Sequence, residues 1–456
     1  MRRPYKLPVA EARPELKDIK PKISRVVIIL LKLFTWLYLF LYFGIHKTTL
    51  REQRIVFEAF RRAMAGESRL MIAFRHPNGG EPQLLTVFFL FKLRKLAAKL
   101  GIYFARKPHS VFVYGFEVVR WGGWAARYIM PGVGAMPVYH AKISSKSLEM
   151  IYNAIVNGPY PLAIAPEGKI SYTADTVPQL ESGVIRMGFH AAQRLASSGS
   201  KIPVEVLPLS VHFRFGYWGH VTLEWLLRKI EKTCGFKPDK KLPFDKRAGR
   251  CRDRILSLNE KRYGIEADPS GDFEPRLETV VYAALENAER ILGIKGEGEV
   301  PTRMHKANQV YWDQLFVPGV ETMRGKSRLD RGILDLRAGE AWYAGRHVEL
   351  VELSWYFRLP LPAEDSALHA KVEYAQNLWD FANRTMGGAI KNRLNILPRR
   401  VILQAAPVLN LSERLKDFKA DKKAATAAAL GDLEKAYLDC IAEASCIKDH
   451  YDEKHG

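Results

Sequence analysis

A histidine and a glutamate frame the loop in the stretch AFRHPNGGEPQLL, residues 73–85. The apolar run before His76, residues 69–74, predicts a short buried strand, and the apolar run after Glu81, residues 84–91, predicts the core of a helix. The two side chains therefore lie between rigid elements, where catalytic groups are often placed. A carboxylate that orients an imidazole ring and stabilises its protonated form makes the ring a general base.

A second carboxylate, Glu167, lies on a Pro-Glu-Gly turn that follows an apolar stretch at residues 160–165. Ligands of open α/β sheets bind at the carboxyl ends of the strands, where this turn is expected to lie. We expect Glu167 to hold the hydroxyl groups of an acceptor and Lys169 to meet an anionic headgroup, with Gly168 between them in the same substrate-binding site. Together with the histidine base, this set suits transfer of an acyl group to a hydroxyl, without an enzyme nucleophile.

These residues also allow other interpretations. A Pro-Glu-Gly sequence alone is most often an ordinary turn. Gly168 and Lys169 resemble the end of a phosphate-binding loop, but Ala163 and Ile170 stand where that motif needs glycine and a hydroxyl residue. His76 and Glu81 lack a third ligand at helical spacing, so no metal is expected. We expect no other cofactor either.

The elements that must position these residues alternate between strands and helices. Strands are predicted at residues 69–74, 102–107, 160–168 and 204–215, and helices at residues 48–66, 82–101, 122–130, 144–158 and 181–199. Such alternation predicts an α/β fold with a mostly parallel sheet flanked by helices.

Beyond about residue 226 the alternation gives way to helical periodicity, in residues 277–293, 366–394 and 421–445, with no chemical motif. Residues 399–415 predict a late strand that returns to the sheet. The expected organisation is therefore a basic arm at residues 1–24, a membrane-associating helix at residues 25–47, a catalytic domain at residues 48–225 and a mainly helical region at residues 226–456.

The segment at residues 25–47 is apolar apart from Lys32 and has near the minimum length for a bilayer span. Trp36, Tyr38 and Tyr42 suit the interfacial layer, and Lys32 can extend its ammonium group towards water. Both flanks are basic, so the positive-inside rule does not predict the orientation of the segment in a membrane. The segment either spans the bilayer or lies in one leaflet. A buried core helix is the alternative.

Composition narrows the choice of partners. The chain of 456 residues has 70 Lys and Arg against 49 Asp and Glu, a formal charge of +21, which suits an anionic membrane surface, a phosphorylated or CoA-like substrate, or nucleic acid. No nucleic-acid-binding signature accompanies the charge, so we expect no nucleic-acid partner. The four cysteines form no CxxC pair, which is typical of reduced thiols in a cytosol-facing protein. The expected location is the membrane, with the active site facing the cytoplasm.

Four short pieces resemble the four sequence blocks of the glycerolipid acyltransferase family, which contains the 1-acylglycerol-3-phosphate acyltransferases. The family patterns are H-x4-D, G-x-I-F-I-x-R, F-P-E-G-T/S-R and V-P-x-x-P-V. The corresponding pieces here are residues 76–81, 134–140, 165–171 and 204–209, in the same order within residues 48–225. The resemblance implies a glycerol-3-phosphate acyltransferase-like fold, with His76 and Glu81 as the catalytic pair.

The sequence departs from the family chiefly in the acceptor-binding blocks. Glu81 stands where aspartate is usual, and Ile170 follows Lys169 where the family has a hydroxyl residue and an arginine. His140 and Lys142 stand near the position of the family's phosphate-binding arginine. We expect these two residues and Arg75 to help Lys169 bind the acceptor.

The resemblance predicts a membrane-bound O-acyltransferase of phospholipid biosynthesis, which uses acyl-CoA or acyl-carrier protein as co-substrate. The acceptor would be a lysophosphatidate-like lipid or a glycerol phosphate, and the partners would be the lipid acceptor, the acyl thioester and membrane lipids. Transfer to a neutral or non-phosphate lysolipid, and a non-catalytic lipid-binding protein that keeps the fold, are the alternatives. The oligomeric state stays open.

Overall fold

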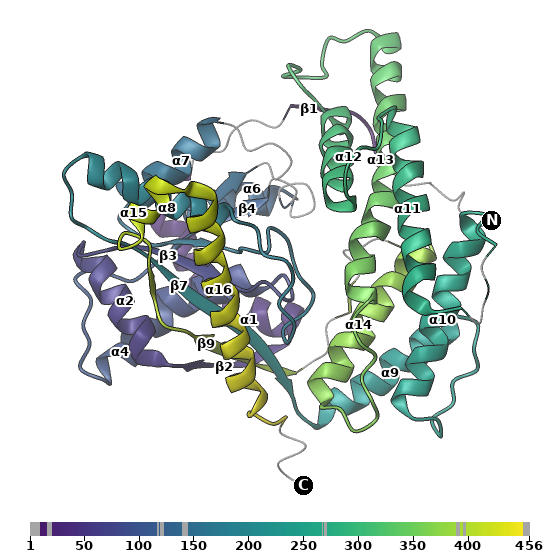
Figure 1. Ribbon diagram of the computed structural model, residues 1–456, viewed down its shortest axis with the longest axis horizontal. Coiled ribbons are helices and arrows are strands. Elements are labelled where there is room, and N and C mark those ends of the chain that lie inside the picture. Colours follow the sequence, from purple (N-terminus) through teal and green to yellow (C-terminus); the bar gives the residue numbers. More distant parts are fainter. Residues whose placement is uncertain are drawn as a thin grey trace. The chain divides into compact units, whose positions relative to one another are not determined.

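The fold comes from a computed structural model (Figure 1). It describes residues 10–15, 21–115, 118, 123–138, 145–266, 268, 271–388, 393–394 and 398–449. The chain forms two compact units. An α/β unit contains residues 19–223, 367–373 and 395–456, and a helical unit contains residues 1–18, 224–366 and 374–394.

The α/β unit is built on a central sheet with the strand order β2-β9-β7-β3-β6-β4-β5. Strands β7, β3, β6, β4 and β5 run parallel, whereas β9 is antiparallel to β7 and parallel to β2. The prediction of an α/β fold with a mostly parallel sheet is therefore confirmed. The strand bounds are β2 Ile45–Arg51, β3 Arg69–Phe74, β4 Val111–Gly115, β5 Met136–Val138, β6 Leu162–Ile164, β7 Val204–Phe215 and β9 Arg399–Ala405, and β10, Leu409–Asn410, pairs with β7.

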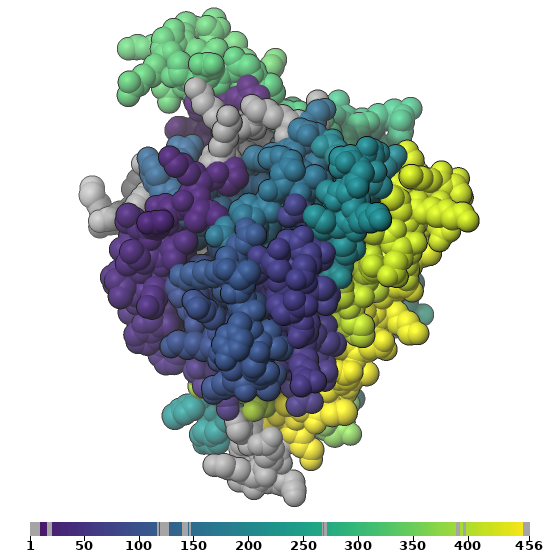
Figure 2. Space-filling view, turned by 90° about the vertical axis from the view of Figure 1, so that its left-hand side faces the viewer, coloured from purple at the N-terminus to yellow at the C-terminus, as the bar shows by residue number. Residues whose placement is uncertain are grey.

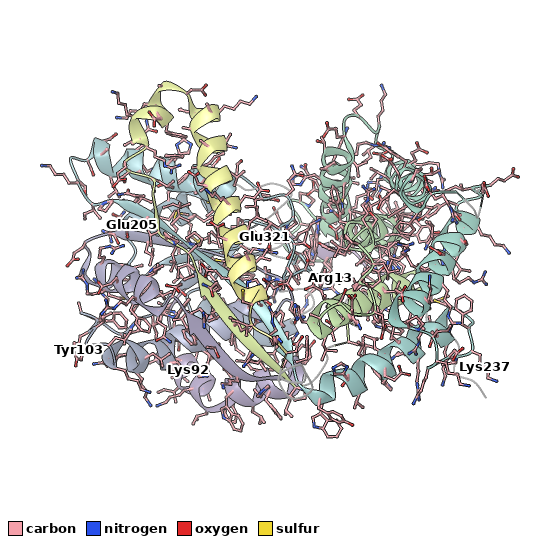
Figure 3. All side chains as sticks on the ribbon, turned by 60° about the horizontal axis from the view of Figure 1, so that its bottom comes forward. Arg13, Lys92, Tyr103, Glu205, Lys237 and Glu321 are labelled. Atoms are coloured by element: carbon pink, nitrogen blue, oxygen red, sulfur yellow. The ribbon has the colours of Figure 1, made fainter. Side chains whose placement is uncertain are left out.

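Helices cover both faces of this sheet. Val204 and Val206 of β7 share one hydrophobic core with helices α7, Ser145–Val156, α8, Gly183–Ser197, and α16, Lys422–Ser445. Glu205, labelled in Figure 3, points to the opposite face because side chains alternate along a strand, and it accepts a 3.1 Å hydrogen bond from Arg62. Arg62 belongs to α2, Gln53–Ala65, which therefore covers that second face.

The stretch after Glu81 is helical as predicted, in three consecutive parts. These are α3, Glu81–Val87, a π-helical turn at Phe88–Leu93, and α4, Arg94–Ala98. Phe89 packs on Phe60 of α2 with ring centroids 4.9 Å apart, so this helical stretch lies on the same face as α2. The predicted helices near residues 122–130, 144–158 and 181–199 are confirmed as α6, Gly123–Gly132, α7 and α8.

Three local predictions differ from the structure. The strand predicted at residues 160–168 is limited to β6, Leu162–Ile164, because Pro166 has no N–H for a ladder and the chain turns there. Residues 102–107 are not a strand, because the backbone N–H of Ile102 caps the preceding helix at Ala97 and Pro108 has no N–H for a ladder; the strand begins only at Val111. The helix predicted from residue 48 begins at Gln53, since residues 45–51 form β2 alongside β9. Its end at Gly66, in the left-handed conformation, is confirmed.

The late strand predicted in residues 399–415 is confirmed, and it changes the division of the chain. Because β9 lies between β2 and β7, the segment after residue 395 belongs to the α/β unit rather than to one region spanning 226–456. Figure 2 shows this C-terminal segment, in yellow, beside the teal and purple segments of the same unit.

The helical unit agrees with the periodicity of the sequence. Its core contains Ala288, Ala307, Ala344 and Val348. Part of the predicted N-terminal arm belongs here, since β1, Arg13–Pro14, pairs with β8, Phe316–Val317. The helices are α10, Phe244–Arg262, α11, Phe273–Leu292, α12, Val300–Leu315, α13, Arg328–Phe357, and most of α9, Tyr217–Thr233, and α14, Leu368–Thr385.

The apolar segment forms α1, Arg25–Phe43, which ends at Gly44 in the left-handed conformation, φ +65°. Of its residues, three are buried: Thr35, Leu39 and Phe43. Among the described helices it is the one long and apolar enough to cross a membrane. Of its most apolar stretch of 18 residues, 17% is buried.

Candidate active site

The loops after β3 and β6 meet at one edge of the sheet. The two strands are parallel neighbours, with Ala73 opposite Ile164 in the ladder, so their carboxyl ends lie together. A hydrogen bond of 2.9 Å from the backbone N–H of Ser171 to the carbonyl of His76 joins the two loops. This edge is the position at which open α/β sheets bind ligands.

His76 and Glu81 form a direct pair across their loop. Nδ1 of His76 lies 2.6 Å from Oε2 of Glu81, which also accepts a 2.8 Å hydrogen bond from the backbone N–H of Gly79. The His76 side chain is 16% exposed, whereas that of Glu81 is buried. Glu81 is the first residue of α3, where the helix dipole stabilises a carboxylate.

The pairing decides which nitrogen of His76 is available. A carboxylate accepts hydrogen bonds, so Nδ1 carries the proton and Nε2 of the neutral ring keeps its lone pair. Within the part of the chain that the structure describes, His76 donates or accepts through its backbone and Nδ1, and Nε2 has no partner. This arrangement can remove a proton from a hydroxyl group placed at Nε2.

Two glycines give the loop its shape. Gly79 has φ +101°, a conformation that side chains disfavour, and a Cβ there would lie 3.1 Å from Ile170. A Cβ at Gly80 would lie 2.8 Å from the ring of Phe43, the last residue of α1. The loop of His76 and Glu81 is therefore packed between the end of α1 and the Pro-Glu-Gly loop.

Arg75 and Glu167 form a buried ion pair beneath this loop. Nε of Arg75 donates to Oε1 of Glu167, and Arg75 also donates 2.8 Å hydrogen bonds to the carbonyls of Thr173 and Thr176. Oε2 of Glu167 accepts a 2.7 Å hydrogen bond from the backbone N–H of His76. Both carboxylate oxygens thus face protein donors, and the buried Arg75 faces inward, which differs from the acceptor contacts predicted for the two residues.

The remaining residues of the Pro-Glu-Gly loop lie near its surface. Gly168 has φ +66°, and a Cβ there would overlap the carboxylate of Glu181, at 2.3 Å. This glycine therefore serves the turn itself. Lys169 is exposed beside the loop of His76 and Glu81, as a contact with a soluble or lipid headgroup requires.

The second sequence block is described only up to its strand. β5 ends at Val138, beside β4, so the block reaches the same edge of the sheet. His140 and Lys142, both predicted to bind the acceptor, lie outside the described residues. Among the described residues no cluster of three or more histidine, cysteine or acidic side chains could hold a metal ion. The four cysteines are unpaired thiols, of which Cys446 is exposed.

Sequence reasoning missed a charged cluster behind the loops. The carboxylate of Asp175 lies between two histidines. Its Oδ1 is 3.0 Å from Nδ1 of His212, and its Oδ2 is 3.2 Å from Nε2 of His369. On the other side of His369, Oδ2 of Asp449 lies 2.8 Å from Nδ1. The two carboxylates raise the pKa of His369 to about 9 against the opposing effect of burial, and they outweigh repulsion from Arg214. Burial lowers the pKa of His212, and the two histidines hold the pKa of Asp175 below its usual range despite burial.

No spacing signal could have revealed this cluster, because its residues come from separate segments of the chain. The same holds for Arg399, whose Nη2 donates a 2.8 Å hydrogen bond to Oδ1 of Asn78 in the loop between His76 and Glu81.

Comparison with known proteins adds no assignment. No family model matches the sequence, and no curated protein matches it.

Proposed function

We propose that this protein is a membrane-bound O-acyltransferase that moves a fatty acyl group from acyl-CoA or acyl-carrier protein to a lysophosphatidate-like or glycerol-phosphate acceptor. The observation that carries the proposal is the pair of His76 Nδ1 and Glu81 Oε2, 2.6 Å apart, at the carboxyl edge of a parallel sheet. The resemblance to the four acyltransferase blocks adds the reaction class. It also supports the proposal that the α/β fold is, more finely, a glycerol-3-phosphate acyltransferase-like one.

In the proposed reaction, Nε2 of His76 takes the proton from the acceptor hydroxyl as the oxygen attacks the thioester carbonyl. Glu81 stabilises the imidazolium that forms, because its carboxylate already holds Nδ1–H. Collapse of the tetrahedral intermediate breaks the C–S bond, and the imidazolium returns the proton to the thiolate. The products are the acylated acceptor and the free thiol, and the enzyme forms no covalent intermediate.

The exposed apolar surface supports a membrane location. On α1 the exposed side chains include Leu33, Phe34, Trp36 and Leu41. Tyr217 and Trp218, which follow β7, are 60% and 62% exposed. Aromatic residues of this kind favour the membrane–water interface.

The end of α1 and these two aromatic residues lie at one edge of the sheet. Phe215, the last residue of β7, is the ladder partner of Arg399, and the backbone N–H of Arg399 donates a 2.8 Å hydrogen bond to Gly44. The proposed bilayer contact therefore lies at the edge towards which β3 carries His76, since β3 and β7 are parallel.

One observation favours the alternative of a neutral acceptor. Arg75, which was expected to meet a phosphate, is buried against Glu167 and backbone carbonyls. Of the phosphate-binding candidates within the described residues, Lys169 alone is exposed. The net charge of +21 still favours an anionic acceptor or an anionic donor such as acyl-CoA. We therefore retain the phosphate-bearing acceptor as the proposal, with the neutral lysolipid as its competitor.

The decisive experiment is lipid mass spectrometry of membranes with and without the protein, followed by thioester consumption by purified protein in vesicles. Lysophosphatidate, glycerol 3-phosphate and a neutral lysolipid are offered in turn with acyl-CoA. We expect acceptor-dependent release of thiol, reduced by about two to four orders of magnitude in His76→Ala, which removes the base.

His305→Ala is the matched control, because His305 is an exposed histidine on α12 outside the proposed site. It should keep the wild-type rate. Equal rates in His76→Ala and the wild type would exclude the mechanism, and lipid binding without any turnover would identify a non-catalytic lipid-binding protein.

A further inference from the structure

Arg399 is a buried cation that none of the acyltransferase blocks contains. It is the first residue of β9 and lies 1% exposed. Its guanidinium group lies over the ring of Phe213, with Cζ 4.5 Å from the ring centroid. A charge buried this deeply is stable only when hydrogen-bond acceptors surround it.

Two of those acceptors come from functionally distinct elements. Nε of Arg399 donates a 2.6 Å hydrogen bond to the carbonyl of Phe43, and Nη2 donates a 2.8 Å hydrogen bond to Oδ1 of Asn78. Phe43 ends the apolar helix, where carbonyls lack helical partners and a cation is favourable. Asn78 lies between the two catalytic residues in the loop. Arg399 thus links the end of α1 to the loop that carries the base.

The link continues to the catalytic pair by short contacts. The residue after Asn78 is Gly79, whose N–H donates to Oε2 of Glu81, the same oxygen that holds Nδ1 of His76. The ring of Phe43 packs against Gly80 from the other side. A shift of Asn78 would therefore move the hydrogen bond that orients the imidazole.

We propose that Arg399 is a positioning residue that fixes the catalytic loop to the end of the apolar helix, so that His76 is held at the lipid surface. The inference rests on the proposed acyltransferase function. Arg399 contacts neither acceptor nor thioester in this mechanism, and it acts through Asn78 and the carbonyl of Phe43. Lysine cannot replace it fully, because one ammonium group does not reproduce the planar fork that reaches both acceptors.

The test compares Arg399→Met, Arg399→Lys and Asn78→Ala in full-length protein on vesicles of phosphatidylcholine and phosphatidylglycerol. Misplacing the base by about an ångström costs up to about a hundredfold in rate. We expect kcat to fall about tenfold to a hundredfold in Arg399→Met, with the acceptor KM changed less than about threefold, and an intermediate kcat in Arg399→Lys. Arg400→Met, the adjacent and more exposed arginine, is the matched control and should keep the wild-type kcat.

A double-substituted protein separates positioning from general loss of stability. If Arg399 acts through Asn78, then Arg399→Met combined with Asn78→Ala should be no slower than the slower single variant, whereas independent structural defects multiply. Multiplied defects in kcat, or an unchanged kcat in Arg399→Met, would overturn the inference.

Hydrogen exchange of residues 76–81 gives a readout that does not depend on activity. We expect faster exchange there in Arg399→Met and in Asn78→Ala than in the wild type, with α16 unchanged as the internal reference. If Arg399→Met does not fold, Asn78→Ala carries the test alone. If the wild type itself shows no acyl transfer, faster exchange in the variants would support the positioning role of Arg399 while refuting the acyltransferase function. If the wild type is active, unchanged exchange and unchanged activity in the variants would refute the positioning role alone.

Discussion

Glu167 accepts the Nε–H of Arg75 with one carboxylate oxygen and the backbone N–H of His76 with the other, at 2.7 Å. The ion pair is almost completely buried, and Arg75 extends it to the carbonyls of Thr173 and Thr176. The Pro-Glu-Gly loop therefore supports His76, the proposed base, through its backbone N–H, in addition to presenting Lys169 at its surface.

The first prediction concerns this pair. Glu167→Gln should lower the free energy of unfolding by about 3–5 kcal/mol, because it leaves the Arg75 charge buried without a counter-charge. Denaturant unfolding of the purified protein measures the change. Glu149→Gln removes the partner of Arg194 at an exposed pair and should leave stability unchanged. An unfolding free energy that changes as little in Glu167→Gln as in Glu149→Gln would show that the buried ion pair does not stabilise the fold.

The second prediction concerns the length and charge of residue 81. Glu81→Gln should reduce kcat about a hundredfold or more, since the amide cannot stabilise the imidazolium by charge. Glu81→Asp should retain measurable activity, because the carboxylate is kept and the loop glycines allow a small adjustment. Initial rates at saturating acceptor measure both variants. An aspartate variant as inactive as the glutamine variant would contradict the role assigned to the carboxylate.

The third prediction distinguishes the acceptors. Lys169→Ala should raise the KM for lysophosphatidate about tenfold and lower kcat less, because a charged hydrogen bond to the headgroup forms in the ground state as well. Lys237→Ala, an exposed lysine of the helical unit labelled in Figure 3, should change neither constant. A preference for the neutral lysolipid that Lys169→Ala does not alter would assign the protein to the neutral class.

The fourth prediction concerns the exposed face of α1. Phe34→Glu combined with Leu41→Glu places charges at two positions that are 61% and 63% exposed, and it should release the protein from vesicles in a flotation assay. Leu329→Glu combined with Leu336→Glu introduces the same two charges at the same spacing on exposed positions of α13 and should not release the protein. Continued flotation of the α1 variant would indicate that another surface provides the attachment, and the basic segment at residues 92–99 would be tested next.

The fifth prediction follows from the His369 cluster. The pKa of His369, about 9, lies above the value near 6.5 expected for the unfolded chain. Its stabilising contribution, about 3 kcal/mol, is therefore complete below about pH 6.5 and is lost as the pH rises through about 9. Asp175 acts in the opposite direction, since its lowered pKa makes its contribution disappear in acid.

His369→Gln is the variant that tests this dependence. Unfolding free energies between pH 6 and about pH 10 should fall more steeply for the wild type than for His369→Gln. His305→Ala should follow the wild-type curve, because His305 is exposed on a separate helix. Parallel curves for the wild type and His369→Gln would show that the cluster does not carry the pH dependence.

The sequence by itself determined the features that depend on local pattern. The apolar run at residues 69–74 predicts β3, and the Pro/Gly-rich stretch after it predicts the loop with His76 and Glu81, because hydrophobic period and turn chemistry act over a few neighbouring residues. The apolar helix predicted at residues 25–47 follows from the same local pattern. Its end differs from the prediction, since the helix stops at Phe43 and is capped by Gly44.

Only the tertiary structure decided which polar groups face one another. Glu167 was expected to face a ligand, but Arg75 occupies the interior beneath it, and a buried guanidinium requires that carboxylate as its counter-charge. Residues 45–51 became a strand because β9, more than three hundred residues away in the chain, supplies its ladder partner. The same long-range pairing brings Arg399 to Asn78. No periodicity of the sequence encodes this contact. The free energy of a buried ion or of a sheet ladder depends on partners that only the folded chain brings together.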